Sequence, residues 1–322
     1  MSIRGKARRV LFGIDAGEVL VRRRGFHVAD ESARARMERV GREFIGGYHA
    51  ALEEDGAAAI AARLDSTAAA EFRGFAYEGA AMALALLDAI PPFGRRFREF
   101  LEGPGDPHAY MCHVGAGWAV ARLPWLRGRL PRVLDSFQTL GRWLVMDGYG
   151  FHEGYFSWSE RVLKQRSPAG LTGYAARAFD QGLGRSLWFV DGMDVARIPR
   201  TIAGFSRSRQ SDLWSGVGLA SGYAGGAGES QVMHLAREAG EHVRAYQQGV
   251  AFAAKARLRA MTPAGHLEAT CRAACGLSAG SLAALCDETL KGLSGGDSGD
   301  AAVPAYEMWR RRIQTELAGV RR

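Results

Sequence analysis

The sequence predicts a mainly α-helical protein, built either as a helical-hairpin array or as an irregular α-bundle. Apolar residues recur at spacings of three and four, prolines fall between these apolar stretches, and segments that alternate apolar and polar residues are scarce. The first pattern is typical of amphipathic helices, and proline ends helices because it lacks the backbone N–H. Only "RVLFGID" and "EVLVRRRGF", near the N-terminus, are plausible strands. At most a short β element is therefore expected there.

The first long helical stretch is expected in "ARARMERVGREFIGGYHAALEEDGAAAIAARL". Met37, Val40, Phe44 and Tyr48 fall on one stripe of it, because residues three and four apart share a helix face. Further along the chain, breaks separate pieces of the size of a helical hairpin. These breaks are Pro91-Pro92, "GPGDP" at 103–107, Pro124, Pro131, Pro168, Pro199 and Pro263.

Three parts are expected along the chain. Residues 1–291 form a single α-helical domain. Residues 292–303 form a flexible linker, because their glycine, serine and aspartate cannot bury enough apolar surface to order themselves. Residues 304–322 form an amphipathic helix that docks back on the body through apolar residues such as Tyr306 and Trp309. The alternative is that this helix binds a partner or a membrane surface.

A glycine recurs in a similar local context along the chain, usually with an aromatic residue two or three places before it. Six of the seven glycines have alanine or serine four places later, which places small residues on one helix face and allows close packing. Spacing near 34 residues is typical of stacked helical hairpins. Glycine inside a helix costs ~1 kcal/mol relative to alanine, so close contacts must offset that cost. The glycines are Gly47, Gly79, Gly115, Gly154, Gly182, Gly216 and Gly249, at successive spacings of 32, 36, 39, 28, 34 and 33.

Composition excludes several classes of protein. The net charge of +8 comes from 42 basic and 34 acidic residues; it reflects either an arginine-rich coding bias or an anionic partner. No nucleic-acid-binding module is recognised, and no nucleotide-binding loop follows a strand. Neither a signal peptide nor an apolar stretch of about 20 residues occurs, which predicts a cytoplasmic protein.

The cysteines and histidines do not indicate a metal centre. Cys112, Cys271, Cys275 and Cys286 are too few and too unevenly spaced for a disulfide framework, so buried reduced thiols are expected. No HExxH motif or paired-ligand spacing occurs, and neither a metal nor a cofactor is predicted.

Candidate chemistry lies next to the recurring glycines. The preceding residues would form a polar row if the helices stack in register; they are Gly46, Glu78, Val114, Glu153, Gln181, Ser215 and Gln248. A carboxyl group buried among aromatic residues has a raised pKa and can act as a general acid or base. The alternative is that Glu78 and Glu153 pair with arginines such as Arg73 or Arg161 and only hold helices together.

His113 and His152 each lie two residues before a recurring glycine and would neighbour that row. Arginine beside tryptophan, in "FDQGLGRSLWFVDG" and "FSRSRQSDLWSGVG", can bind anionic or oxygen-rich groups, or simply cover the aromatic ring. The predicted catalytic residues are Glu78, His113, His152, Glu153 and Asp180. The predicted substrate-binding residues are Tyr77, Trp118, Arg185, Trp188, Asp212 and Trp214.

Many long motifs, in order along nearly the whole chain, resemble the UnbL-type family, which has long been labelled a domain of unknown function. These motifs are "RGF" at 24–26, "FIGGYHAAL", "RGFAYEGAAMALALLD", "YMCHVGAGWAVARL", "DGYGFHEGYF", "FDQGLGRSLWFVDG", "DLWSGVGLASGYAGG", "QGVAFAAKAR" and "PAYEMWRRRI". The resemblance implies a cytoplasmic protein of enediyne natural-product biosynthesis. It also implies as neighbours a polyene-making polyketide synthase and other pathway proteins, a membrane protein among them.

Two functional hypotheses follow from this resemblance. In the first, the protein is an enzyme that isomerises, cyclises or rearranges a polyketide-derived polyene. Glu153 or His152 would then move protons, and Arg185 would hold a carboxyl or oxygenated terminus. In the second, the protein is a non-catalytic polyene-binding protein or a helical scaffold for pathway partners. An alanine- and aromatic-rich interior suits a hydrophobic ligand in either case.

Overall fold

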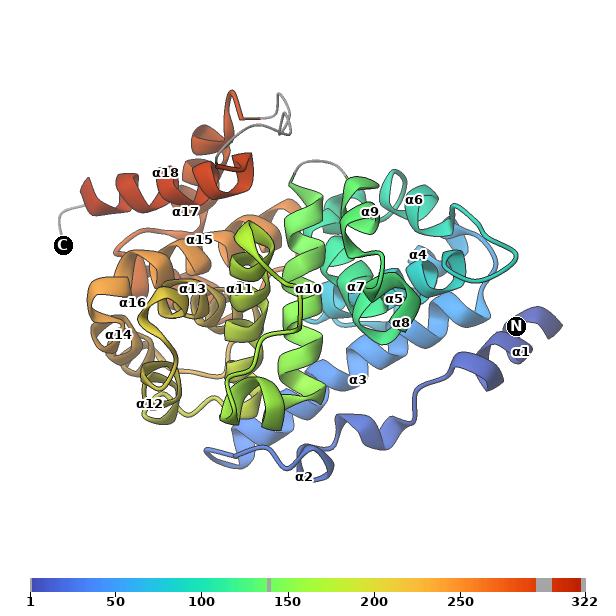
Figure 1. The fold of residues 1–322 in the computed structure, drawn as a ribbon, viewed down its shortest axis with the longest axis horizontal. Helices are drawn as coiled ribbons and strands as arrows, with labels where there is room; N and C mark the ends of the chain where they lie inside the picture. The colour runs from blue at the N-terminus through green and yellow to red at the C-terminus, as the bar shows by residue number, and fades with distance from the viewer. Residues whose placement is uncertain (1, 138–139, 294–302, 320–322) are drawn as a thin grey trace.

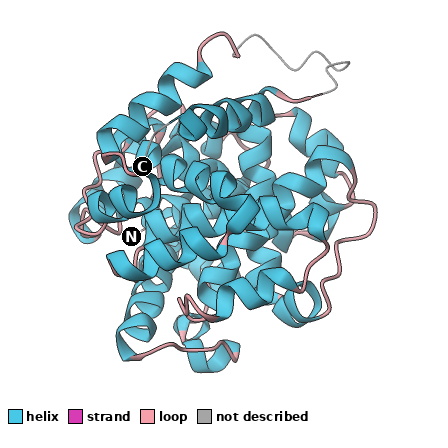
Figure 2. Ribbon diagram, turned by 90° about the vertical axis from the view of Figure 1, so that its left-hand side faces the viewer, coloured by secondary structure: helices cyan, strands magenta, loops and turns pink. Residues whose placement is uncertain are grey.

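The computed structural model describes residues 2–137, 140–293 and 303–319, and every regular element in these ranges is a helix (Figures 1 and 2). The predicted all-α fold is confirmed. Both segments that were plausible strands are helical instead, because each closes its backbone hydrogen bonds locally. They lie in α1 (Ile3–Phe12), a 3₁₀ turn (Ala16–Val19) and α2 (Val21–Arg24). Ser2 caps α1 and Asp15 caps the 3₁₀ turn through their side-chain oxygens.

Seven helices form a continuous row in chain order, each packed on the next (Figure 1). Their bounds are α3 (Glu31–Glu53), α5 (Arg73–Asp88), α7 (Ala109–Arg122), α10 (Gly141–Phe156), α11 (Gly173–Val190), α13 (Arg207–Ala224) and α15 (Val243–Arg259). We call these the row helices. The segments between them carry short helices, so each connection returns the chain to the starting end of the next row helix.

Neighbouring row helices in the second half run in the same direction. On the N-terminal side of the point where α11 and α13 are closest, Asp180 of α11 pairs with Arg209 of α13. C-terminal to the closest approach of α10 and α11, Gly154 lies against Ser186. The same C-terminal pairing is seen between α13 and α15, where Gly222 lies against Ala253. The array is therefore made of parallel helices separated by connectors, not of antiparallel hairpins.

Glycines at positions i and i+2 bring α7, α10, α11 and α13 against both of their neighbours, whereas α5 has Gly79 on one side and Ala81 at the i+2 position. Two residues span about 200° around a helix, so the two glycines face opposite sides. In α11, a Cβ on Gly182 would lie 1.8 Å from the Asp147 carbonyl oxygen of α10. On the other side of α11, a Cβ on Gly184 would lie 2.1 Å from the Leu213 oxygen of α13. No side chain fits at either place, so only glycine allows this approach.

The same contact repeats along the row and sets its register. Helix α10 meets α7 through Gly148, whose Cβ would lie 2.0 Å from the Val114 oxygen, and meets α11 through Gly150. Gly154 instead faces the Ser186 side chain, so Gly148 is the equivalent of the other recurring glycines. Placing Gly148 in the series changes the spacings on either side of it to 33 and 34. The sequence-based choice of Gly154 was wrong by six residues, about 1.7 turns along the helix.

The remaining helices flank the row. The connectors contain α4 (Ala57–Thr67), α6 (Arg96–Leu101), α8 (Pro124–Arg127), α9 (Leu130–Asp135), a π-helical turn (Ser159–Leu163), α12 (Arg197–Ala203), α14 (Glu229–Glu238) and α16 (Leu267–Cys275). Two short 3₁₀ turns, Asp106–His108 and Gly240–His242, precede α7 and α15. Most of the predicted linker at 292–303 lies outside the described residues.

The last two helices close the far end of the molecule. Helix α17 (Ala279–Leu290) packs on α15, and α18 (Ala305–Gly319) packs on both α15 and α17. Tyr306, Trp309, Ile313 and Leu317 of α18 are buried in these contacts. In the described part of the chain, no individual helix has the length and apolarity to cross a membrane; only the bent pair Leu267–Cys275 and Ala279–Leu290, with a 67° bend, meets that test.

Two adjacent glycines of α3 give a matched test of the close contacts. A Cβ on Gly47 would lie 1.9 Å from the Ala76 carbonyl oxygen, whereas a Cβ on Gly46 would meet nothing within 4 Å. We expect Gly47→Ala to lower the free energy of unfolding by about 2 kcal/mol or more, because α3 and α5 must move apart. Gly46→Ala should raise it by up to about 1 kcal/mol through helix propensity. Urea unfolding of both variants measures the difference, and equal effects would contradict the proposed contact.

Candidate functional site

The residues that precede the row glycines form a buried polar row across the helices. With Gly148 in register, Asp147 takes the place that the sequence analysis gave to Glu153. Glu78, Asp147, Gln181, Ser215 and Gln248 are each at most 1% exposed. Their backbone positions explain this burial. The carbonyl of Glu78 touches Gly115, that of Asp147 touches Gly182, and that of Ser215 touches Gly249, so these residues lie where neighbouring helices are closest.

Hydrogen bonds join most of this polar row and tie it to α18. The Gln181 side-chain amide donates to Asp147 at 2.8 Å and to the Tyr306 hydroxyl at 2.9 Å. The Ser215 hydroxyl donates to Gln248 at 2.9 Å. Arg310 of α18 also donates to Gln248, at 3.1 Å. Buried polar groups are costly unless paired, so this network fixes how α18 sits on the row.

Glu78 stands apart from that network. Its carboxyl faces a cavity of about 60 Å³, the Glu78 cavity, and within the described residues its Oε1 atom accepts no hydrogen bond. The other walls come from the N-terminal segment, α3, α5, α7, α10 and α11. The apolar lining residues are Ile14, Val19, Met37, Val40, Phe44, Ile45, Phe75, Met82, Trp118, Phe151, Tyr155, Phe156 and Phe189. Glu18 and Arg122 complete the polar part of the lining.

Burial raises the pKa of Glu78 to about 8. The positive charge of Arg185 opposes this shift and the negative charge of Asp147 adds to it. The Trp118 indole N–H also lowers the pKa of Glu78 slightly, although the two groups do not make a hydrogen bond of ordinary geometry. Glu78 is therefore a neutral acid at pH 7, held against an aromatic wall with a free oxygen and a free indole donor nearby.

A second cavity lies beyond Glu78, next to α18. It measures about 30 Å³, and we call it the Asp147 cavity. Asp147 and Arg185 form a buried ion pair in its wall, and the guanidinium of Arg185 lies over the Phe151 ring, 4.8 Å from its centre. Since Phe151 lines the Glu78 cavity, the ion pair and this ring stand between the two cavities. The remaining lining is Tyr110, Met111, Val114, Leu144, Leu219, Tyr223, Phe252, Lys255, Ala256, Tyr306 and Trp309.

Of the residues predicted from the sequence, Trp118 lies beside Glu78. Its ring packs at 4.5 Å from the centre of Phe44 and edge-on to Phe151 at 5.1 Å. His152 packs on Phe156 at 4.7 Å and edge-on to Trp118 at 5.5 Å. His152 therefore lies behind the cavity wall, and burial lowers its pKa.

Glu153 occupies a different environment from Glu78. Arg161 donates two hydrogen bonds to its carboxylate, at 2.9 and 2.6 Å. Burial alone would raise the pKa of Glu153, but His152 and Arg161 outweigh burial, so its pKa is lowered. Glu153 is thus ionised and paired, the structural arrangement that the sequence analysis kept as the alternative.

Three further predicted residues point away from the Glu78 cavity. His113 hydrogen-bonds through Nδ1 to the Ala109 carbonyl, at 2.7 Å, and packs edge-on against Phe97 and Phe137. Asp180 accepts two hydrogen bonds from Arg209 at the α11–α13 contact. Tyr77 stacks on His108 with ring centres 3.9 Å apart, and donates to Asp65 at 3.2 Å.

The other predicted binding residues hold helices together. Trp188 is fully buried and donates to the Gly225 carbonyl at 2.9 Å. Asp212 accepts from Arg310 at 2.7 Å and from Arg177 at 2.9 Å, which makes it the anchor of α18. Trp214 packs edge-on against Tyr246 at 6.1 Å.

The sequence analysis missed Asp147 and Tyr223. Asp147 directly precedes Gly148, so a stricter search for 33- to 34-residue spacing would have found it. Tyr223 is 2% exposed, and its hydroxyl has no hydrogen-bond partner among the described residues. It lies where Gly74 has no side chain, because a Cβ there would be 1.8 Å from the hydroxyl oxygen. No local sequence pattern marks such a pairing.

In the described part of the chain, the cysteines and the other side chains able to bind metal form no further candidate site. Cys112, Cys271, Cys275 and Cys286 are buried and reduced, as predicted. Within residues 2–137, 140–293 and 303–319, no three His, Cys, Asp or Glu side chains gather as metal ligands.

The raised pKa of Glu78 gives a testable dependence of stability on pH. Between about pH 4.5 and 8 the folded chain keeps a proton on Glu78 that the unfolded chain has lost, so this group destabilises the fold as pH rises. Glu78→Gln should therefore raise the free energy of unfolding at pH 8, by roughly 4 kcal/mol. The gain should shrink as pH falls toward 4.5. Urea unfolding over a series of pH values measures it.

Glu153→Gln is the matched control for that measurement. Because the pKa of Glu153 is lowered, its stabilising effect is present at neutral pH and lost as pH falls through the folded-state pKa. This substitution should destabilise the protein at pH 7 and have little effect in acid. Shifts of the same sign in both variants would mean that Glu78 is not the protonated carboxyl.

Comparison with known proteins places the chain in a family. The family described as Protein of unknown function (DUF1702) matches residues 3–317. Neither the curated proteins nor the solved structures include a significant match. Because the family match covers nearly the whole chain, this protein belongs to the DUF1702 family.

Proposed function

We propose that the protein is a cytoplasmic enzyme of enediyne biosynthesis that acts on the polyketide-derived polyene by acid–base chemistry. The pathway rests on the resemblance to the UnbL-type family. The chemistry rests on one observation: a neutral carboxyl, Glu78, sits in the wall of an aromatic cavity with one oxygen unpaired. Groups with strongly perturbed pKa values in apolar pockets are candidates for catalysis.

The proposed step is a proton-transfer isomerisation or cyclisation. Glu78 adds a proton to one carbon of the conjugated chain, which leaves a delocalised carbocation and a Glu78 carboxylate. Loss of a proton from another carbon to that carboxylate restores the acid and moves the double bonds, so no oxidant or cofactor is consumed. The rings of Trp118, Phe151 and Tyr155 line the cavity, and aromatic rings can stabilise a carbocation.

The charged pair behind the cavity supports this role. Asp147 raises the pKa of Glu78 and Arg185 lowers it, so the pair sets how readily Glu78 gives up its proton. Arg185 was expected to hold a carboxyl or oxygenated end of the substrate. Its charge is already balanced by Asp147, so we assign it to this electrostatic role first.

The second candidate function is a non-catalytic polyene-binding protein or scaffold for pathway partners. Its scaffold version is favoured by the size of the cavities, about 60 and 30 Å³, because a bound hydrocarbon chain would have to widen them. It is also favoured by the structural ion pairs of Glu153 and Asp180. The two functions differ in whether the bound chain leaves chemically changed.

Incubation with the polyene released by the synthase, followed by mass spectrometry of bound and free products, separates these functions. An enzyme should convert the polyene, and Glu78→Gln should bind it but convert it on the order of a hundredfold more slowly. Trp118→Ala should lose binding in either case. A carrier would return the polyene unchanged and tolerate Glu78→Gln. Loss of conversion in Glu153→Gln alone would instead assign the proton transfer to Glu153, as in the first hypothesis from the sequence.

The pH dependence of conversion tests the protonation state. With Glu78 as the acid, the rate should be steady below about pH 7 and fall as pH rises through about 8, where Glu78 ionises. The residual rate of Glu78→Gln should lack that fall. A rate that rises through pH 8 would show that a base, not the neutral acid, is required.

A further inference from the structure

Helix α1 (Ile3–Phe12) is attached to the body by one face only. A Cβ on Gly5 would lie 2.2 Å from the Glu53 carbonyl oxygen of α3, so α1 lies directly on that helix. Arg9 pairs with Glu53 at 3.2 Å, and the Tyr48 hydroxyl donates to the Phe12 carbonyl at 2.9 Å. These contacts fix which side of α1 faces outward.

The outward face of α1 is apolar. Ile3, Val10 and Leu11 are 87%, 85% and 72% exposed. At about 100° per residue, these three positions fall within a sector of roughly 100° on the side away from Gly5. Exposed apolar side chains gathered on one helix face mark a surface that another apolar phase covers.

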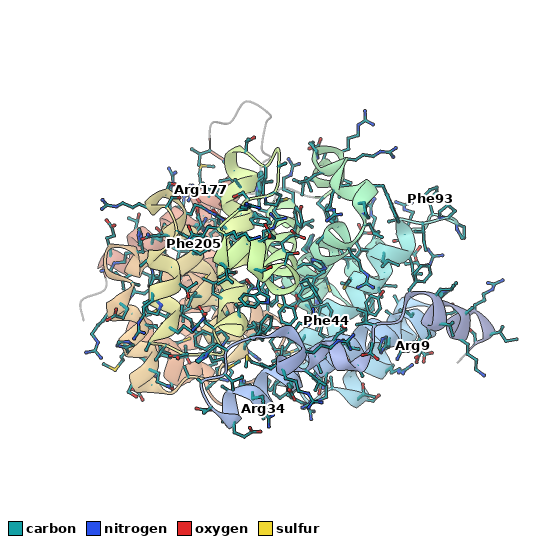
Figure 3. All side chains as sticks on the ribbon, turned by 60° about the horizontal axis from the view of Figure 1, so that its bottom comes forward. Arg9, Arg34, Phe44, Phe93, Arg177 and Phe205 are labelled. Atoms are coloured by element: carbon teal, nitrogen blue, oxygen red, sulfur yellow. The ribbon has the colours of Figure 1, made fainter. Side chains whose placement is uncertain are left out.

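Cations flank this apolar face on both sides. Arg4 and Lys6 are exposed and, among the described residues, make no ion pair. Arg8 lies at the edge and pairs with Asp55 at 3.0 Å. Residues 3–12 contain no acid. Phe93, which is 73% exposed, lies at the same end of the molecule as Arg9 (Figure 3).

We propose that α1 is an interfacial helix that attaches the protein to a bilayer surface rich in anionic lipid. An apolar stripe bordered by basic residues is the arrangement that lies in a membrane interface, with the apolar side chains among the acyl chains and the cations at the headgroups. The absence of acids from residues 3–12, and of polar side chains from the apolar face formed by Ile3, Val10 and Leu11, favours lipid over a protein surface. The net charge of +8 acts in the same direction.

The location of α1 connects this surface to the interior. The chain leaves α1 at Phe12, and two residues later Ile14 lines the Glu78 cavity. Attachment through α1 would bring that cavity near an apolar phase. The inference itself depends only on α1 and holds whether or not the protein acts on a polyene.

Co-sedimentation of the full chain with vesicles tests the inference. Vesicles of phosphatidylcholine are compared with vesicles of equal parts phosphatidylcholine and phosphatidylglycerol. The protein should sediment with the anionic vesicles, weakly with the neutral ones, and less at high salt. The variant Val10→Asp/Leu11→Asp should bind the anionic vesicles at least about tenfold more weakly. Leu163→Asp is the matched control, because Leu163 is 61% exposed outside α1 and should leave binding unchanged.

Three outcomes would overturn the proposal. The first is no preference for the anionic vesicles. The second is a salt-sensitive binding that Val10→Asp/Leu11→Asp leaves intact, which would show adsorption by net charge alone. The third is a dimer of the natural chain in size-exclusion chromatography that the same variant dissociates without vesicles, which would assign the face to a second copy. Circular dichroism and thermal unfolding confirm that each variant is folded.

Discussion

The fold depends on main-chain contact between parallel helices. At each step along the row, a carbonyl oxygen of one helix occupies the space where a Cβ of the next would lie, as at Gly182 and Gly216. Glycine within a helix is unfavourable by itself, so at these positions the close contact must stabilise the fold by more than the glycine destabilises the helix. An interior helix has neighbours on two sides, and in α7, α10, α11 and α13 two glycines at i and i+2, about half a turn apart in angle, serve both contacts.

That contact also explains why the polar row exists. In α5, α7, α10, α11 and α13, the residue before the recurring glycine presents its carbonyl to the recurring glycine of the next row helix, so its side chain begins where the two helices are closest. Neighbouring residues satisfy Gln181 and Ser215 through a chain of hydrogen bonds. Among the described residues, Glu78 Oε1 and Gln248 Nε2 have no hydrogen-bond partner. Of these two side chains only Glu78 can ionise, and burial favours its neutral form. The site is thus a consequence of the packing pattern together with one residue choice.

Much of the fold could be predicted from the sequence, because helical period and proline breaks are local signals. The stripe through Met37, Val40, Phe44 and Tyr48 is buried in α3 as expected. The register of α10 could not be fixed in the same way, since "DGYGFHEGY" offers three glycines and only the neighbouring carbonyls decide between them. That single choice carried Glu153 into the predicted row and left Asp147 out.

Site residues could be predicted only where the residue type and its position relative to a recurring glycine were enough to identify them. Glu78 and Trp118 were named from their positions and lie together at one cavity. The ion pair of Glu153 with Arg161 was named only as an alternative, and that of Asp180 with Arg209 was not predicted, because both depend on how connectors and neighbouring helices fold. The N-terminal segment shows the same limit. Its short apolar runs fit strands, but without a partner strand they form helical turns.

The paired glycines also limit how the chain can change in length. One residue inserted in the middle of a row helix would turn everything after it by about 100°. Both glycine contacts would then be lost on one half of that helix, and a bulky side chain would meet a neighbouring carbonyl. Insertions in the connectors leave the facing surfaces untouched, and a whole added unit of helix plus connector would simply lengthen the row. Length variation should therefore accumulate between the row helices, while the polar residue beside each glycine can change the chemistry of the interior without altering the backbone.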